Sequence, residues 1–314
     1  MSKLNSLNKS QIHQALFILL AIASLLPWVS APIALLAGII FTNLFKSTIV
    51  KSKASLVKRL LQISIIGLGF GMNISEALEV GKEGLLLTIF TLTFVFLLGW
   101  GIGKLMGLDR KISYLISSGT AICGGSAIAA VAPLIKANEK EISIAIGTVF
   151  ILNAIALFAF PVIGHLLELS QHDFGIWSAI AIHDTSSVVG AASQYGEEAL
   201  EIATTVKLSR ALWIIPLCVV TAFAFKQQDQ GIKMPYFILL FVVAMLISSW
   251  LPQFNEIYVW ISYLAKRLLV LTLFLVGTQL TLATIKTAGV KSMLFGTILW
   301  IAVSVVSLAV ILVW

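Results

Sequence analysis

The sequence predicts an all-α polytopic membrane protein of about eleven transmembrane helices, with inverted repeats and discontinuous helices. The first observation behind this prediction is composition: 59% of the 314 residues are hydrophobic, only 11% are charged, and the mean hydropathy is +1.02. A soluble core of this size needs far more charge to cover its surface. The other two observations are a regular series of long apolar segments and a motif that occurs twice.

Apolar segments of the length that spans a bilayer follow one another along the whole chain. They cover residues 14–29, 31–46, 57–76, 83–104, 112–134, 142–166, 174–194, 199–225, 234–251, 263–285 and 290–313. The first segment follows Lys3 and Lys9 and resembles a signal peptide, but Pro32 directly follows the candidate cleavage site, so we expect a retained span. Residues 1–314 are therefore expected to form a single integral membrane transporter domain.

The charges in the loops predict an orientation. With these spans, most loop lysines and arginines fall on the side of the N-terminus, and only Lys82, Lys136 and Lys140 fall on the other. The positive-inside rule then places the N-terminus in the cytoplasm and the C-terminus outside. The lysine-rich connection at 45–56 would face anionic lipid headgroups. Because the charge of +7 lies mostly in loops and not on a basic helix, we expect no nucleic-acid partner.

The repeated motif is Lys58-Arg-Leu-Leu61, which recurs as Lys266-Arg-Leu-Leu269. At the same offset Gly69 matches Gly277, and Gly81 matches Gly289. The copies lie near 55–105 and 263–313, and the predicted spans give them opposite orientations. Inverted repeats are typical of secondary transporters. The alternative is a chance similarity between leucine-rich helices.

A weaker similarity links Ala121-Ile-Cys with Ala181-Ile-His, and Glu141-Ile with Glu201-Ile. With eleven spans the two regions run in the same direction, so this similarity cannot belong to the inverted repeat.

Candidate site residues occur first in the fifth span, which contains Cys123-Gly124-Gly125-Ser126. A glycine weakens a helix by roughly 1 kcal/mol relative to alanine, and freed backbone groups are tolerated at that depth only in a cavity or inside protein. A discontinuous helix here would direct backbone amides at an anion. The alternative is close helix packing through small residues. Asn153, in the sixth span, is a further candidate for polar lining.

The strongest candidates lie between residues 181 and 210: His183, Asp184, Thr185, Ser186, Lys207 and Arg210. Each charge near the middle of a membrane helix costs roughly 3 kcal/mol on insertion scales. Lys207 and Arg210 share one helix face. If Asp184 offsets one cation, a positive charge remains, and that favours a small anion. His183 changes charge near neutral pH, and a carboxylate binds H⁺ or Na⁺. A polar cluster that only holds two helices together is the alternative.

Other chemistry finds little support in the sequence. Cys123 and Cys218 lie inside apolar runs, which argues against a disulfide or a zinc site. The glycine-rich stretches have no nucleotide-binding context, and no nucleophile is paired with a base. We therefore expect no cofactor, no metal and no enzymatic activity.

The motifs at Cys123–Ser126, His183-Asp184 and Lys207 with Arg210, together with Lys58-Arg-Leu-Leu, resemble the YeiH-type family of bacterial inner-membrane proteins, which are catalogued as sulfate exporters. The resemblance covers essentially the whole chain. It implies a fold like that of the cation–proton antiporters and bile-acid symporters, with two inverted five-helix repeats and crossed discontinuous helices. In such a scheme the fifth and tenth spans would cross. It also implies a bacterial inner-membrane location, and a homodimer is compatible with it.

The residues and the resemblance together predict a secondary active transporter that exports a small anion such as sulfate or a sulfonate, coupled to H⁺ or Na⁺. Arg210 and Lys207 would bind the anion with help from backbone amides at Cys123–Ser126. His183 and Asp184, followed by Thr185 and Ser186, would couple or gate transport. The alternatives are a cation/proton antiporter that uses Asp184, with Lys207 as an internal counter-charge, and a channel or scaffold.

Overall fold

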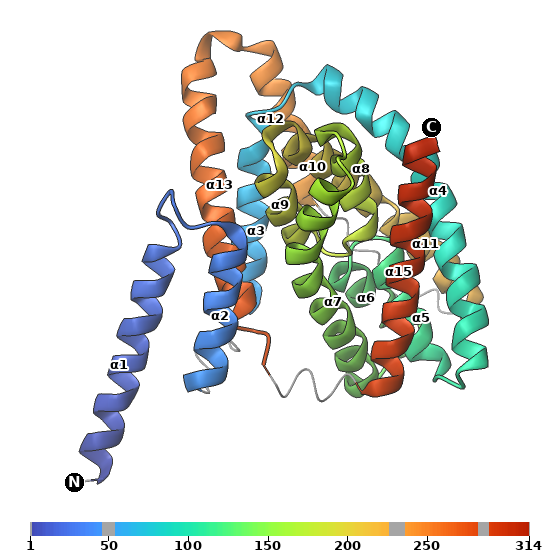
Figure 1. Ribbon diagram of the computed structural model, residues 1–314, viewed down its shortest axis with the longest axis horizontal. Coiled ribbons are helices and arrows are strands. Elements are labelled where there is room, and N and C mark those ends of the chain that lie inside the picture. Colours follow the sequence, from blue (N-terminus) through green and yellow to red (C-terminus); the bar gives the residue numbers. More distant parts are fainter. Residues whose placement is uncertain (1, 46–53, 226–235, 282–288, 314) are drawn as a thin grey trace. The chain divides into compact units, whose positions relative to one another are not determined.

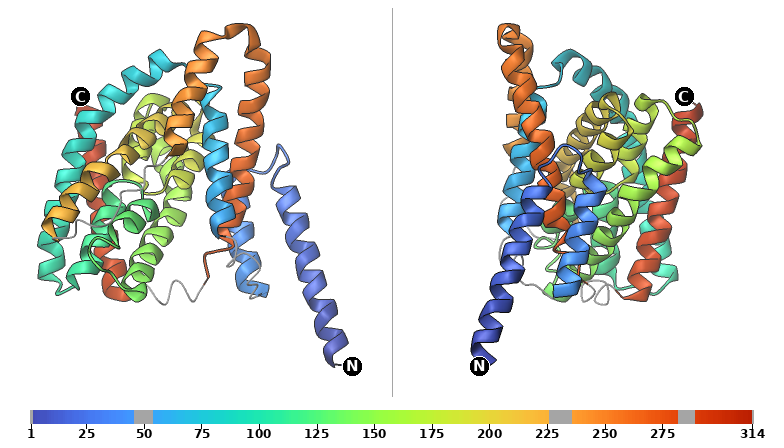
Figure 2. Two further views of the ribbon diagram at one scale, coloured as in Figure 1. Left: turned by 180° about the vertical axis from the view of Figure 1, so that it is seen from behind. Right: turned by 60° about the vertical axis from the view of Figure 1, so that its left-hand side comes forward.

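The computed structural model describes residues 2–45, 54–225, 236–281 and 289–313 (Figures 1 and 2). Every regular element in these ranges is helical, so the predicted all-α class is confirmed. Most of the expected lysine-rich connection at 45–56 lies outside the described residues, as does part of the second repeat copy, at 282–288.

Several of the described helices are suited to a membrane by length and composition. Those long and apolar enough to cross it are Leu87–Leu105, Glu139–Leu166, Glu197–Ala224, Pro252–Gly277 and Val290–Val313. Shorter apolar helices are Gln11–Ala23, Ala31–Phe45 and Tyr236–Trp250. The chain is therefore a helical membrane protein, in agreement with its composition.

The chain divides into two compact units. One comprises Met1–Asn73 and Phe237–Leu282, and the other comprises Ile74–Tyr236 and Ala283–Trp314. We call them the first and second units.

The first unit contains the Lys-Arg-Leu-Leu motifs. Its helices are α1 (Ser2–Ala23), α2 (Ala31–Phe45), α3 (Ala54–Gly69), α12 (Tyr236–Trp250) and α13 (Asn255–Gly277), with a short 3₁₀ turn, η2 (Pro252–Phe254), before α13. Val57, near the start of α3, packs with Val270 and Phe274, near the end of α13. Gly67, near the end of α3, faces Ala265 in the middle of α13. The helices α3 and α13 are therefore antiparallel, as an inverted repeat requires.

The repeated glycines of the first unit occupy equivalent contacts. A Cβ atom on Gly69 of α3 would lie 2.8 Å from the carbonyl oxygen of Phe241 in α12. A Cβ atom on Gly277 of α13 would overlap the carbonyl oxygen of Leu35 in α2. Each glycine therefore permits close approach to the helix that precedes the other copy of the repeat in the sequence.

The second unit contains the candidate site. Its helices are α4 (Ile74–Leu105), α5 (Arg110–Ala121), α6 (Gly125–Val131), α7 (Glu139–Leu166), α8 (Gln171–Ala181), α9 (Thr185–Tyr195), α10 (Glu197–Leu212), α11 (Ile214–Ala224) and α15 (Val290–Val313). Asn138 and Glu141 form a capping box that starts α7. Ser170 and Asp109 cap the starts of α8 and α5.

The segment 112–134 does not cross the unit. The Lys111 ammonium donates to the carbonyl oxygen of Lys136 at 2.8 Å, although 25 positions separate these residues. A continuous helix of that length would hold its ends about 38 Å apart. The chain therefore enters along α5, turns at Ile122–Gly124 and returns along α6 to the end where it began. We call this pair of half-helices hairpin 1.

The segment 174–194 behaves in the same way. The Tyr195 hydroxyl donates to the carbonyl oxygen of Leu169 at 2.7 Å, across 26 positions. The Tyr195 ring also stacks on Phe174, with ring centroids 3.8 Å apart. The chain enters along α8, turns at Ile182–Asp184 and returns along α9. We call this pair hairpin 2, and the residues at the two turns the tips.

These two hairpins correct the sequence-based topology. The 28-residue helix α7 connects them, so hairpin 1 begins at one end of α7 and hairpin 2 at the other (Figure 1). The expectation that both segments cross in the same direction is therefore wrong. The similarity between Ala121-Ile and Ala181-Ile marks equivalent positions, where each first half-helix ends, in two hairpins of opposite orientation. Apolar length did not reveal this, because a hairpin of two short half-helices contains as many residues as one crossing helix.

Candidate functional site at the hairpin tips

The tips of the two hairpins meet beside the middle of α7. Gly124 has φ = 62°, a left-handed conformation that favours glycine. A Cβ atom at this position would lie 3.3 Å from Val149 of α7 and 3.5 Å from the backbone of His183. Glycine therefore permits the turn beside Val149, and the tip of hairpin 2 lies in contact with it.

Asn153 of α7 holds the tip of hairpin 2. Its Oδ1 atom accepts hydrogen bonds from the backbone N–H groups of His183 at 3.0 Å and Asp184 at 3.3 Å. Asn153 is buried, and its Nδ2 atom has no hydrogen-bond partner among the residues that the structure describes. An unpartnered buried donor is costly, so a free amide here is a candidate contact for an acceptor.

The residues of hairpin 1 lie in different environments. Cys123 is a buried free thiol, and Gly125 faces the ring of Phe150. Ser126 is exposed. No side chain caps the start of α6. Its first backbone N–H groups are therefore not satisfied by a capping side chain.

Asp184 starts the returning half-helix of hairpin 2. Its Oδ2 atom accepts hydrogen bonds from the Ser186 backbone N–H at 3.1 Å and from the Ser186 hydroxyl. Asp184 is partly exposed, whereas Thr185 and Ser186 are buried. The Asp184 carboxylate is thus oriented by its own helix as an N-cap.

Lys207 of α10 is fully buried, with 0% of its surface exposed. Its ammonium donates to the carbonyl oxygens of Ile182 at 2.6 Å and Ala179 at 3.1 Å. Both carbonyls belong to the C-terminal end of α8. A cation is stabilised there by the negative end of the helix dipole.

Arg210, three residues further along α10, is also 0% exposed. Its guanidinium donates to the Thr91 hydroxyl of α4 at 3.0 Å and to the carbonyl oxygen of Ala121 at 2.5 Å. Ala121 is the last residue of α5, so the two cations of α10 bind the ends of the entering half-helices of both hairpins. Within the described part of the chain, the Nε atom of Arg210 has no hydrogen-bond partner.

The site contains more positive than negative charge. Among the residues that the structure describes, no carboxylate lies within 4.0 Å of either Lys207 or Arg210. Asp184 therefore forms no ion pair with these cations. Carbonyl dipoles offset part of the charge of each cation, but they carry no net charge.

His183 is also completely buried at the tips, and neither nitrogen of its ring has a hydrogen-bond partner in the described ranges. Two hydroxyls of α5, those of Ser117 and Thr120, are likewise buried without a partner. Buried polar atoms are normally satisfied in native structures. These atoms are therefore available to a proton carrier, a water molecule or a substrate.

The structure brings the predicted site residues of hairpin 1, hairpin 2 and α10 into one region. It adds Thr91 and the carbonyl groups of Ala121, Ala179 and Ile182, which sequence reasoning missed. Neither a threonine in an apolar helix nor a backbone carbonyl can be recognised as a site group from the sequence alone. Over the described part of the chain, no group of three His, Cys, Asp or Glu side chains is placed to hold a metal ion.

These features define a class: polytopic helical membrane proteins in which two opposed re-entrant hairpins meet beside buried cations. The chain belongs to the family described as Conserved hypothetical protein 698, whose model matches residues 12–296. That membership is in agreement with the resemblance found in the sequence.

Several curated relatives are similar over nearly their whole length. A UPF0324 membrane protein of Bacteroides thetaiotaomicron is 50% identical over 289 residues, which cover 90% of this chain and 87% of that protein. One from Photobacterium profundum is 48% identical, covering 96% and 93%. One from Bdellovibrio bacteriovorus is 46% identical, covering 98% and 97%. No solved structure matches the chain.

Proposed function

We propose that this protein is a secondary active transporter that exports a small anion, such as sulfate or a sulfonate, in exchange or symport with H⁺ or Na⁺. The observation that carries the proposal is the pair of fully buried cations, Lys207 and Arg210, which no carboxylate neutralises in the described part of the chain. A buried charge without an opposite charge is costly, and such residues in membrane segments mark substrate or ion pathways.

The anion would bind between the hairpin tips and α10. In the described part of the chain, two carbonyl oxygens accept from the three donors of the Lys207 ammonium, and the Nε–H of Arg210 has no acceptor. The unpartnered amide of Asn153 and the backbone at Cys123–Ser126 would supply further donors. Two hairpins of opposite orientation fit the inverted symmetry of alternating-access transporters.

Asp184 and His183 would carry the coupling ion. Asp184 is partly exposed and forms no ion pair, so its carboxylate is accessible to H⁺ or Na⁺. His183 follows Ile182, whose carbonyl binds Lys207, so a change of charge on the histidine would act directly on the anion site.

The orientation of the protein in the membrane is also part of this proposal. Hairpin 1 returns Lys136 and Lys140 to the end of the second unit that carries Arg110 and Lys111. This end is therefore richer in positive charge than the sequence-based topology suggested, and we assign it to the cytoplasm. The helix α15 begins at Val290 beside this end and finishes at the other, so the C-terminus is assigned to the outside of a bacterial inner membrane. The N-terminus is assigned to the cytoplasm, as the loop charges predict.

The decisive experiment is radiolabelled sulfate flux in proteoliposomes, with and without an imposed pH or Na⁺ gradient. We expect saturable flux that a gradient drives, and loss of that flux in Arg210→Ala. If Arg210→Ala transports as fast as the parent, Arg210 does not bind the anion. The absence of flux for sulfate and for sulfonates under every gradient would refute anion transport.

A cation/proton antiporter is the second candidate, and the accessible, unpaired carboxylate of Asp184 favours it. In that case Lys207 would compete with the bound cation as an internal counter-charge. A Na⁺-dependent change of internal pH in vesicles that contain no transportable anion would establish this function and exclude the first.

A further inference from the structure

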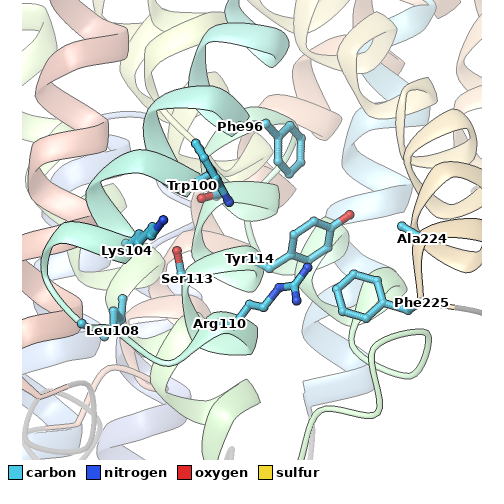
Figure 3. Close-up of a pocket in the computed structure, with 12 residues that line it drawn as sticks. Phe96, Trp100, Lys104, Leu108, Arg110, Ser113, Tyr114, Ala224 and Phe225 are labelled. Atoms are coloured by element: carbon cyan, nitrogen blue, oxygen red, sulfur yellow. The ribbon is translucent and has the colours of Figure 1, made fainter.

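A separate cavity of about 700 Å³ lies between the C-terminal part of α4, the first half of α5 and the end of α11 (Figure 3). None of the tip residues lines it. Aromatic rings from all three helices form its walls, namely Phe96 and Trp100 of α4, Tyr114 of α5 and Phe225, directly after α11. The proposed transport function uses none of these residues.

Two cations lie at the end of this cavity where α4 finishes and α5 begins. The ammonium of Lys104 lies 5.7 Å from the ring centroid of Trp100, and the guanidinium of Arg110 lies 5.8 Å from that of Phe225 (Figure 3). Within the described ranges no carboxylate lies within 4.0 Å of either cation. Asp109, between them in sequence, directs its carboxylate to the backbone N–H groups of Lys111 and Ile112. The aromatic rings hold both cations in place without using their hydrogen-bond donors.

The wall formed by α5 carries hydroxyl groups further along the cavity. Ser113 donates weakly to the carbonyl oxygen of Gly99, at 3.3 Å, and the Tyr114 hydroxyl is paired with Thr221. Ser117, one turn deeper, is 2% exposed, and no residue that the structure describes forms a hydrogen bond with its hydroxyl. An unsatisfied buried hydroxyl in the wall of a cavity is a candidate contact for a bound polar group.

The sides of the cavity are continuous with apolar surface. Trp100 is 70% exposed, Leu105 is 88% exposed and Phe223 of α11 is 68% exposed. Exposed apolar residues on long membrane-spanning helices face lipid, and tryptophan and lysine near a helix end mark the level of the headgroups. The cavity is therefore placed where acyl chains and headgroups meet.

We propose that this cavity binds an anionic phospholipid, with its phosphate between Lys104 and Arg110. The glycerol region would contact the hydroxyls of α5, and an acyl chain would lie along Phe96 and Trp100. Two cations without a carboxylate partner select a negative headgroup, and the aromatic walls select a ligand with a hydrophobic part. A water-borne anion would use the cations but leave the apolar walls hydrated.

The test is native mass spectrometry of protein released from nanodiscs that contain equal amounts of phosphatidylglycerol and phosphatidylcholine. We expect phosphatidylglycerol to be retained in preference, and Lys104→Gln/Arg110→Gln to reduce its retention roughly tenfold or more. Lys111→Gln is the matched control. Lys111 is adjacent to Arg110 but contacts Lys136 and Glu141 instead of the cavity, so this variant should retain lipid like the parent.

A second variant tests whether lipid binding needs the volume of the cavity, independently of its two cations. Ala224→Trp would fill the cavity from the α11 side with both cations intact, and we expect it to lose phosphatidylglycerol as well. If the double variant fails to fold, Ala224→Trp still tests whether the cavity binds the lipid. Equal retention of both lipids, or undiminished retention in either cavity variant, would overturn the proposal. So would displacement of phosphatidylglycerol by glycerol 3-phosphate, which has no acyl chain.

Discussion

Gly124 lies against the backbone of His183, so the turn of one hairpin is in contact with the turn of the other. The two residues are 59 positions apart and belong to half-helix pairs that enter from opposite ends of α7. A residue larger than glycine is strained at this position, because Gly124 has a positive φ and a Cβ atom there would lie 3.3 Å from Val149.

Gly124→Ala should therefore destabilise the protein by about 1–3 kcal/mol, the cost of placing a residue with a Cβ atom at φ = 62° and ψ = −126°, a region that only glycine adopts readily. Thermal unfolding in detergent would measure the change. Gly101→Ala is the matched control, because no atom lies within 4 Å of a Cβ at that position in α4. We expect that control to be neutral or slightly stabilising, since alanine favours a helix. Equal effects of the two substitutions would contradict the positive φ of Gly124 on which the turn of hairpin 1 depends.

The re-entrant hairpins predict which residues share a side of the membrane. Single cysteines at Arg110 and Lys140 should react with a membrane-impermeant thiol reagent from one side, and cysteines at Glu168 and Glu198 from the other. All four positions are exposed, whereas the native Cys123 and Cys218 are buried. If segment 112–134 crossed the membrane, the cysteines at positions 110 and 140 would instead react from opposite sides.

Asp184→Asn separates the structural and coupling roles of this residue. Asparagine is as good an N-cap as aspartate, so the hydrogen bond to the Ser186 backbone should persist and the unfolding temperature should change little. The amide cannot bind a proton or a cation as a carboxylate does. We expect flux that no longer responds to a pH or Na⁺ gradient. Fully coupled flux in a stable variant would show that Asp184 is only a cap.

Arg210→Lys retains the positive charge at this position but loses the planar guanidinium group. A single ammonium group cannot reproduce the planar guanidinium that joins Thr91 to Ala121, so hairpin 1 should lose its link to α10. We expect at least a tenfold loss of sulfate flux and a lower unfolding temperature. Arg59→Lys, at an exposed position of α3, is the control and should change neither.

Lys207→Met removes the donor that satisfies the end of α8. The carbonyl groups of Ala179 and Ile182 would lose this partner in a buried setting, at a cost of about 1–3 kcal/mol. Chemical or thermal unfolding in detergent would detect it. Unchanged stability would mean that water reaches the tip of hairpin 2 and replaces the ammonium group.

The sequence predicted the helical membrane class correctly but not the topology. Hydropathy identified a helical membrane protein, and the cost of buried charge singled out Asp184, Lys207 and Arg210. The hairpins were missed because apolar length alone cannot distinguish one crossing helix from two half-helices. The similarity between Ala121-Ile and Ala181-Ile pointed to the hairpins, because equivalent turns follow both pairs. Thr91 could not have been predicted, because only the fold brings it to Arg210.

The hydrogen bond between Arg210 and the carbonyl oxygen of Ala121 also has a consequence for biogenesis. Its partners are 89 residues apart, so hairpin 1 leaves the ribosome long before the side chain that completes it. Until α10 is inserted, the end of α5 lacks this donor at a depth where water is scarce. The tips can therefore close only late in synthesis, and truncation before residue 210 should leave hairpin 1 exposed to membrane quality-control proteases.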